Sequence, residues 1–310
     1  MSGADRDSFA EYRDRLEAMG FRPKRRFGQN FLLDPSLHAV IASAANIGGE
    51  DRAIEIGGGL GFLTRELAVR AAEVLVAEID PLLARVLRED FADRRNVQVV
   101  EGDALGSDDR LGPSLEVALE EAERRCSRRT VVAANLPYAT SGPLLAALAV
   151  RRASPPIAGM GLLVQLEFAR RLVAAPRSED YGGLTVLAQA YFEVRLLRTV
   201  GREVFRPRPN VDSAIVELRS RPIGGSAAAA HRPEFARFVR QLFTGRRKVL
   251  RHALDTVEPG WRELVEQPDR VGSCRAEELG HEEVQDLFAR LAPRRGSMAG
   301  PSLDGSGSTT

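Results

Sequence analysis

Four short apolar segments separated by helical patterns are the feature that most constrains how this chain folds. They cover residues 53–56, 73–79, 97–100 and 130–134. Strands that alternate with helices pair in parallel through crossover connections. We therefore predict an α/β fold with an open parallel sheet, in which the carboxyl ends of these strands meet at one edge.

The helices between the strands are predicted from apolar spacing and from residues typical of helix starts. Asp34 is a good N-cap and Pro35 a good first residue for a helix over residues 35–45. Further helices are expected at 8–20, 62–70, 81–89, 113–129, 165–174 and 185–191, and further strands at 158–163, 194–197 and 214–218. From residue 233 onward only helical spacing remains, with core positions at Phe235, Phe238, Leu242 and Leu254.

The pattern divides the chain into four parts. We predict an N-terminal helical extension at 1–20, a main α/β domain at 21–222, a small all-α domain at 223–294 and a disordered tail at 295–310. Residues 224–230, Gly-Gly-Ser followed by four alanines, are the expected linker between the two domains. The tail is small and polar, which is typical of disorder.

Glycine or an acid follows each of the first three strands. The turn 57–61 contains four glycines, including Gly57 and Gly59, but Phe62 stands where a dinucleotide-binding fingerprint needs glycine. Glu78 comes 21 residues after Gly57, where an acid binds the two hydroxyls of a ribose, and Asp103 can accept a hydrogen bond from an adenine amine. No glycine-lysine-serine phosphate loop is present. These residues predict a site for a nucleoside without phosphates, such as S-adenosylmethionine.

The fourth strand leads into Asn135-Leu136-Pro137-Tyr138, which suits the binding of a flat aromatic amine. Tyr138 offers a face on which a base can stack. The side-chain oxygen of Asn135 and the backbone carbonyl of Leu136 or Pro137 can accept hydrogen bonds from an exocyclic amine. Taken alone, the same four residues also fit a plain turn between a strand and a helix.

Several motifs in one order resemble the ribosomal RNA adenine dimethyltransferase family. They are residues 27–32 (Phe-Gly-Gln-Asn-Phe-Leu), 55–61, 103–104, 135–138, 205–213 and 246–248. The resemblance runs from about Phe21 to Leu291 and is strongest to the branch that modifies small-subunit rRNA. It implies a Rossmann-like class I S-adenosylmethionine-dependent methyltransferase that dimethylates N6 of two adjacent adenosines in the loop of the 3′-terminal helix of 16S rRNA.

The resemblance also implies residue roles. Methyl-donor contacts fall on Asn30, Leu32, Gly57, Gly59, Glu78, Asp103 and Asn135. Catalytic positions fall on Asn135, Leu136, Pro137 and Tyr138, with Phe205 as the candidate for the second face of the base. The chain departs from the family at Ala139-Thr140-Ser141 and at Gly58, where the family usually has Asn-Ile-Ser and proline. We expect Gly58 to loosen the glycine turn.

The net charge of +1 hides two basic clusters without intervening acids. They contain Arg22, Lys24, Arg25 and Arg26, and Arg246, Arg247, Lys248 and Arg251. Separate basic surfaces on a nearly neutral protein are typical of a surface that binds the phosphate backbone of RNA. We assign both clusters to RNA binding.

Other features limit the setting and the chemistry. The N-terminus lacks an apolar core of a signal peptide, and no apolar run is long enough to span a membrane. Two distant cysteines predict neither a disulfide framework nor a zinc site, and the four histidines fall in helical contexts. We expect a cytoplasmic, monomeric protein whose partner is the small ribosomal subunit and which uses no metal.

Three alternatives remain open. A large-subunit rRNA methyltransferase of the macrolide-resistance type shares fold and chemistry, although Leu136 and the 205–213 loop favour the small-subunit branch. A ribosome-assembly factor with secondary catalysis is a second possibility. A nicotinamide dehydrogenase is a third, and Phe62 argues against it.

Overall fold

The computed structural model describes residues 13–14, 17–24, 27–107, 110–151, 156–222, 227–245 and 248–291. Its centre is a seven-stranded sheet with the strand order β4-β3-β2-β5-β6-β9-β7. The strands are β2 (Arg52–Ile56), β3 (Glu73–Glu78), β4 (Val97–Glu101), β5 (Thr130–Asn135), β6 (Ile157–Gln165), β7 (Phe192–Val200) and β9 (Ser213–Ser220). The first five run parallel, and β9 pairs antiparallel with both β6 and β7. The predicted α/β fold is therefore confirmed.

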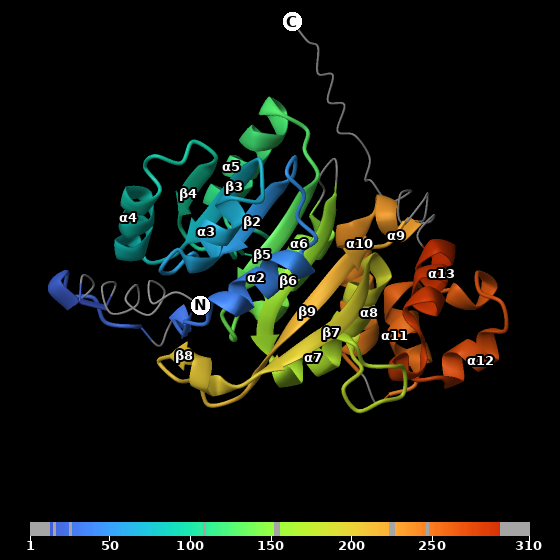
Figure 1. The fold of residues 1–310 in the computed structure, drawn as a ribbon. Coiled ribbons are helices and arrows are strands. Elements are labelled where there is room, and N and C mark those ends of the chain that lie inside the picture. Colours follow the sequence, from blue (N-terminus) through green and yellow to red (C-terminus); the bar gives the residue numbers. More distant parts are fainter. Residues whose placement is uncertain are drawn as a thin grey trace, which may run out of the picture.

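Helices cover both faces of the sheet (Figure 1). They are α2 (Pro35–Ala44), α3 (Phe62–Ala68), α4 (Pro81–Asp90), α5 (Pro113–Arg125), α6 (Ser141–Val150), α7 (Leu166–Leu172) and α8 (Gly183–Tyr191). Alternate strand residues serve the two faces, because successive side chains of a strand point in opposite directions. In β5, Val131 and Ala133 pack into the core that contains α2 and α3, whereas Val132 and Ala134 pack into the core that contains α6 and α8.

The helix starts confirm the reading of the N-caps. The Asp34 carboxylate accepts the backbone N–H of Ser36, and Asp80 caps α4 in the same way through Leu82. In both helices a proline occupies the first turn, where its missing N–H costs nothing. These caps fix the end of the loop that precedes α2 and of the loop that follows β3.

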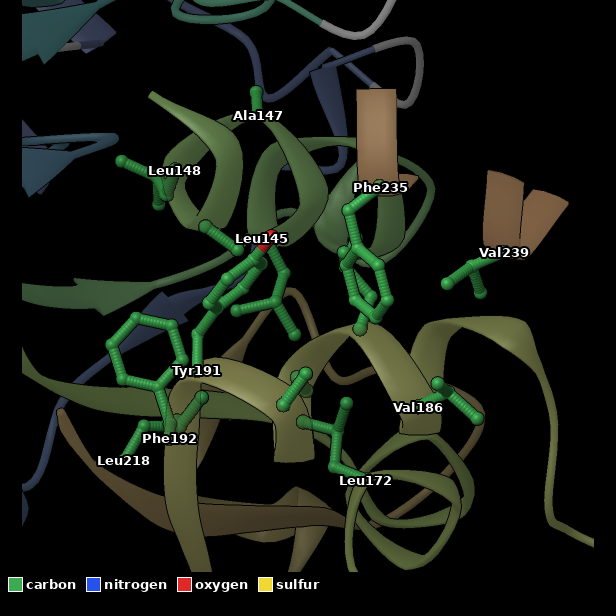
Figure 2. Packing of buried hydrophobic residues seen from close by; sticks show 14 of the residues in the cluster. Leu145, Ala147, Leu148, Leu172, Val186, Tyr191, Phe192, Leu218, Phe235 and Val239 are labelled. Carbon is green, nitrogen blue, oxygen red and sulfur yellow. The ribbon is translucent and has the colours of Figure 1, made fainter. Parts of the chain in front are cut away.

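The C-terminal helices gather at the β7 end of the sheet (Figure 1). They are α9 (Ala227–Ala230), α10 (Arg232–Phe243), α11 (Leu250–Val257), α12 (Pro268–Ser273) and α13 (His281–Leu291). Phe235, Phe238, Leu242 and Leu254 are buried, as predicted. Figure 2 shows Phe235 of α10 beside Tyr191 of α8, and their ring centroids are 5.9 Å apart. One hydrophobic core thus continues from the sheet into these helices.

Some sequence expectations differ from the structure or lie outside it. The alanines of the expected linker form helix α9, because Ala228 is buried against the helices beside it, while residues 223–226 lie outside the described residues. Most of the predicted helix 8–20 and the whole tail 295–310 also lie outside them. The domain boundary at 222/223 stays a prediction.

Two very short strands were missed. β1 (Phe31–Leu32) pairs antiparallel with β8 (Phe205–Arg206), with Leu32 opposite Phe205. Two-residue strands have no periodicity to detect. Their pairing joins segments more than 170 residues apart and brings residues 27–32 to the carboxyl edge of the main sheet.

Candidate active site

The carboxyl ends of β2, β3 and β5 enclose a cavity of about 100 Å³, which we call the strand-end cavity. Residues 27–32, here named the strap, close one side of it. The cavity is lined by Phe27–Leu32, His38, Glu55, Gly57–Leu60, Phe62, Leu63, Glu78, Ile79, Leu83 and Asn135–Tyr138. The parallel topology explains this convergence, because each β-strand delivers its following loop to the same edge.

Glu78 holds the glycine turn in shape. One carboxylate oxygen accepts the backbone N–H of Gly59 at 2.8 Å, and the other accepts the N–H of Asp80 at 2.9 Å. Gly59 has φ +55°, and an added Cβ would meet the ring of Phe31 at 3.4 Å. The positive φ favours glycine at this position, and the ring of Phe31 lies within van der Waals contact of it. Burial raises the pKa of Glu78, and the two backbone hydrogen bonds oppose that shift.

A second buried acid, Glu55, lies deeper in the cavity. It accepts a hydrogen bond from Thr64 Oγ1 at 2.6 Å. Burial raises the pKa of Glu55 to about 8, and the nearby charge of Glu78 adds to the effect. His38 also lines the cavity, and burial lowers its pKa to about 4. At neutral pH both side chains are therefore mainly uncharged.

The strap contacts the catalytic loop directly. The Nδ2 of Asn135 donates a hydrogen bond to the carbonyl of Asn30 at 3.1 Å. Gly28 has φ +61°, and an added Cβ would lie 3.4 Å from the Cβ of Pro137. The strap and residues 135–138 consequently form two sides of one small space.

Some polar groups of the loop after β5 already have hydrogen-bond partners among the described residues, and others do not. Because Asn135 donates through Nδ2, its Oδ1 is left as an acceptor, and no described residue donates to it. The carbonyl of Pro137 already accepts hydrogen bonds from Ser141 Oγ and Thr140 N, which start α6. The carbonyl of Leu136 has no such bond among the described residues. Tyr138 is half-buried, and its hydroxyl hydrogen-bonds to Ser213 Oγ at 2.7 Å.

Most of the sequence-predicted site residues meet at this cavity. Those present are Asn30, Leu32, Gly57, Gly59, Glu78, Asn135, Leu136, Pro137 and Tyr138. Asp103 is exposed at the same edge of the sheet, and its carboxylate accepts the N–H of Leu105 instead of lining the cavity. Their functional roles stay predictions.

Phe205 does not present its ring to the cavity in this structure. The ring is fully buried in the core with Leu32, Leu37 and Ile41. The backbone of Phe205 pairs with that of Leu32, so Phe205 fixes the end of the strap to the hydrophobic core. The expected second stacking face is thus absent here, because the side chain contributes to hydrophobic packing instead.

The two basic clusters differ in how much of them is described. Lys24 pairs with the buried carboxylate of Asp80 at 2.9 Å, whereas Arg22 is exposed. Lys248 and Arg251 are also exposed. Arg25, Arg26, Arg246 and Arg247 lie outside the described residues.

Sequence reasoning missed Glu55, His38 and Gln29 as neighbours of the site. Glu55 sits inside an apolar strand, and an acid at such a position was itself a signal, since charged residues are rarely buried without a partner. His38 and Gln29 gave no comparable signal. In the described part of the chain there is no group of three side chains suited to bind a metal, and no helix long and apolar enough to cross a membrane.

Comparisons with known proteins find relatives that match most of the chain. Residues 20–288 match the family described as ribosomal RNA adenine dimethylase. A Geobacillus thermodenitrificans protein named ribosomal RNA small subunit methyltransferase A is 40% identical over 287 residues, which cover 90% of this chain and 94% of that protein. A Moorella thermoacetica protein of the same name is 41% identical over 278 residues, covering 88% and 93%.

Two solved structures are similar along most of the chain. The dimethyladenosine transferase from Plasmodium falciparum has a TM-score of 0.66 and 24% identity, covering 85% of this chain and 97% of that one, which supports the fold. The 23S rRNA methyltransferase ErmE has a TM-score of 0.57 and 30% identity, covering 84% and 99%.

Proposed function

Because this chain belongs to the ribosomal RNA adenine dimethylase family, we propose that it dimethylates N6 of two adjacent adenosines near the 3′ end of small-subunit rRNA. The adenosines lie in the loop of the 3′-terminal helix of 16S rRNA. The observation that carries the proposal is that Asn135 and Tyr138 border the same cavity as Glu78. The loop that we assign to base binding and the acid that we assign to the ribose therefore border one space.

The strand-end cavity fits the chemistry of S-adenosylmethionine, which supplies a methyl group bound to a sulfonium. The glycines at 57 and 59 allow a ligand to approach the backbone closely, and we assign Glu78, which lines the cavity, to the ribose hydroxyls. Asn30 and Leu32 bring the strap over the same space. Asp103 stands at the neighbouring strand end, where an adenine amine would reach it. No metal ion is needed for this chemistry.

Tyr138 and Asn135 would hold the target adenosine. A base in a helix hides its N6, so the nucleotide must leave its stack and lie against an aromatic ring. Tyr138 provides that ring, and the Asn135 Oδ1 and the Leu136 carbonyl are the acceptors for the amine. Hydrogen bonds from N6 to these oxygens stabilise the positive charge that develops on N6 as the methyl arrives. The remaining acceleration comes from orientation.

The protein would reach its substrate through contacts with the phosphate backbone. Arg22, Lys248 and Arg251 are exposed and suited to such contacts, which give affinity and register but little base identity. Arg25, Arg26, Arg246 and Arg247 complete the two clusters in the sequence. We propose a monomer that acts in the cytoplasm on the small ribosomal subunit.

The large-subunit alternative is less well supported. The two relatives named as small-subunit enzymes are 40% and 41% identical to this chain, against 30% for the 23S rRNA enzyme. The sequence of the catalytic loop also favours the small-subunit branch.

Radiolabelled methyl transfer to unmethylated 30S subunits tests the proposal, with 50S subunits and naked rRNA as controls. We expect label only on 30S subunits, mapped by primer extension to two adjacent adenosines. Label on 23S rRNA would transfer the protein to the large-subunit branch. If donor binds and no RNA is labelled, the assembly-factor alternative gains instead.

Asn135→Ala tests the assigned acceptor. We expect a loss of turnover of about a hundredfold or more, since an acceptor aimed at developing charge is removed. RNA binding, measured by filter retention, should change little. Near-normal turnover would contradict the placement of N6 beside Asn135.

A further inference from the structure

The strap is held at the strand-end cavity by polar contacts of Gln29, which lies within the strap, and of Lys24, which precedes it. Lys24 Nζ lies 2.9 Å from Asp80 Oδ2, and Gln29 Nε2 donates to the same oxygen at 3.2 Å. The oxygen of the Gln29 side chain accepts the backbone N–H of Lys24 at 2.7 Å. These three residues form a closed set of contacts, which we call the latch.

The latch is built on a buried charge. The Asp80 side chain is fully buried, whereas that of Lys24 is 41% exposed. The bonds from Lys24 and Gln29 help to lower the pKa of Asp80 against the effect of burial. Among the described residues, Lys24 is the only cation beside the ionised carboxylate of Asp80. Opening the strap would leave this buried charge without a partner, so the latch favours the closed strap.

The same acid is connected to the ligand-binding turn. Its other oxygen caps α4 through Leu82, and its backbone N–H donates to Glu78. Glu78 in turn holds Gly59. The latch therefore joins the strap to the residues that bind the ribose in the proposed function.

The strap bridges the two loops that border the cavity. Phe31 lies against Gly59 of the glycine turn, and Gly28 lies against Pro137 of the loop after β5. A methyl donor bound between these two loops would lie beneath the strap, so the strap would have to move for the donor to enter or leave.

We propose that Lys24, Gln29 and Asp80 are positioning residues that control methyl-donor exchange by latching the strap shut. Lys24 acts within the protein and is not primarily a ligand of RNA. The inference rests on the proposed function, since it takes the strand-end cavity as the donor site. Opening precedes both entry and exit, so the latch slows both steps.

Stopped-flow binding of S-adenosylhomocysteine to the full chain tests the latch with Lys24→Gln. We expect the association and dissociation rate constants both to rise, each about tenfold, because a hydrogen bond to a charged group is lost. The dissociation constant should change less than either rate. Lys24→Arg should restore most of the slow exchange. Arg95→Gln, which removes an exposed charge elsewhere on the surface, should leave all rates unchanged.

Several results would overturn the inference. A faster dissociation with unchanged association would indicate a lost ligand contact instead of a gate. Unchanged donor rates with a higher KM for RNA would make Lys24 an RNA ligand. Asp80→Asn, which retains an N-cap, provides a second variant, and it too should speed both steps. If the unaltered protein binds no S-adenosylhomocysteine, the proposed function itself fails, a result distinct from a latch without effect.

Discussion

Two hollows in the described part of the chain differ in size and in the side chains that line them. The strand-end cavity measures about 100 Å³, whereas a cleft of about 1250 Å³ lies between helices α5, α6, α8 and α10. We call the latter the helix cleft. The small cavity contains two buried acids with raised pKa values, Glu55 and Glu78. The helix cleft is lined by apolar side chains such as Val239 and by charges engaged in ion pairs, such as Arg151.

This difference indicates that the volume of a hollow does not by itself identify a functional site. Desolvated polar groups cost free energy, so a fold retains them where they serve a ligand or a network. In the strand-end cavity, the buried acids Glu55 and Glu78 have raised pKa values despite their hydrogen bonds. In the helix cleft, Arg151 contacts Glu116 and Glu123 at 2.9 and 2.6 Å, so these charges are paired with one another within the protein. The predictions below test this contrast.

The largest expected effect is at Tyr138. Tyr138→Ala removes the stacking ring and should lower methyl transfer by about a hundredfold, since stacking contributes about 1–3 kcal/mol per base and also orients N6. Tyr138→Phe keeps the ring and loses only the bond to Ser213, so most activity should remain. Steady-state turnover on 30S subunits measures both. Equal losses would show that the hydroxyl, not the ring, is essential.

The next effect concerns Arg151 in the wall of the helix cleft. Arg151→Ala leaves Glu123 partly buried without its partner and should reduce the free energy of unfolding by about 2 kcal/mol. Urea unfolding measures the loss. Arg151→Lys should lose less because it keeps the charge. Donor affinity should remain unaltered, and a marked fall would mean that the helix cleft takes part in the site.

Glu55 should make stability depend on pH. Its pKa is about 8 in the folded protein and 4.5 by its ordinary value, so the unfolded chain releases this proton first as pH rises. Ionisation then favours the unfolded state, and stability falls between about pH 4.5 and 8. Glu55→Gln removes the ionisable group, so the variant lacks this fall in stability with rising pH. Its melting temperature relative to the unaltered protein should therefore increase from pH 5 to pH 8.5, and a constant difference would refute the raised pKa.

The smallest effect is expected at Glu120, which also lines the helix cleft and is exposed. Glu120→Gln removes a solvated charge and should change stability by no more than about 0.5 kcal/mol. Turnover should stay within about twofold. A strong effect on turnover would show that RNA or the donor uses the helix cleft.

The packing around Gly58 is a feature of the glycine turn that the sequence did not reveal. We expected Gly58 to loosen the turn, since the family usually has proline there. In the structure, an added Cβ at Gly58 would lie 2.4 Å from Val76 and 2.8 Å from Leu87. Those side chains fill the space that a proline would need. The packing between separate elements, which no local pattern records, decides what residue fits.

The sequence by itself determined that a sheet forms and in which order strands and helices follow one another along the chain. It also determined that Gly57, Glu78 and Asn135 meet at one edge of this sheet. These follow from apolar periodicity and from the rule that parallel strands share a carboxyl end. Only the tertiary structure decided the placement of the strap, the burial of Phe205 and the pairing of Lys24 with Asp80. These depend on contacts between residues 56 to more than 170 positions apart, whose free energies come from packing and desolvation, so neither spacing nor composition reveals them.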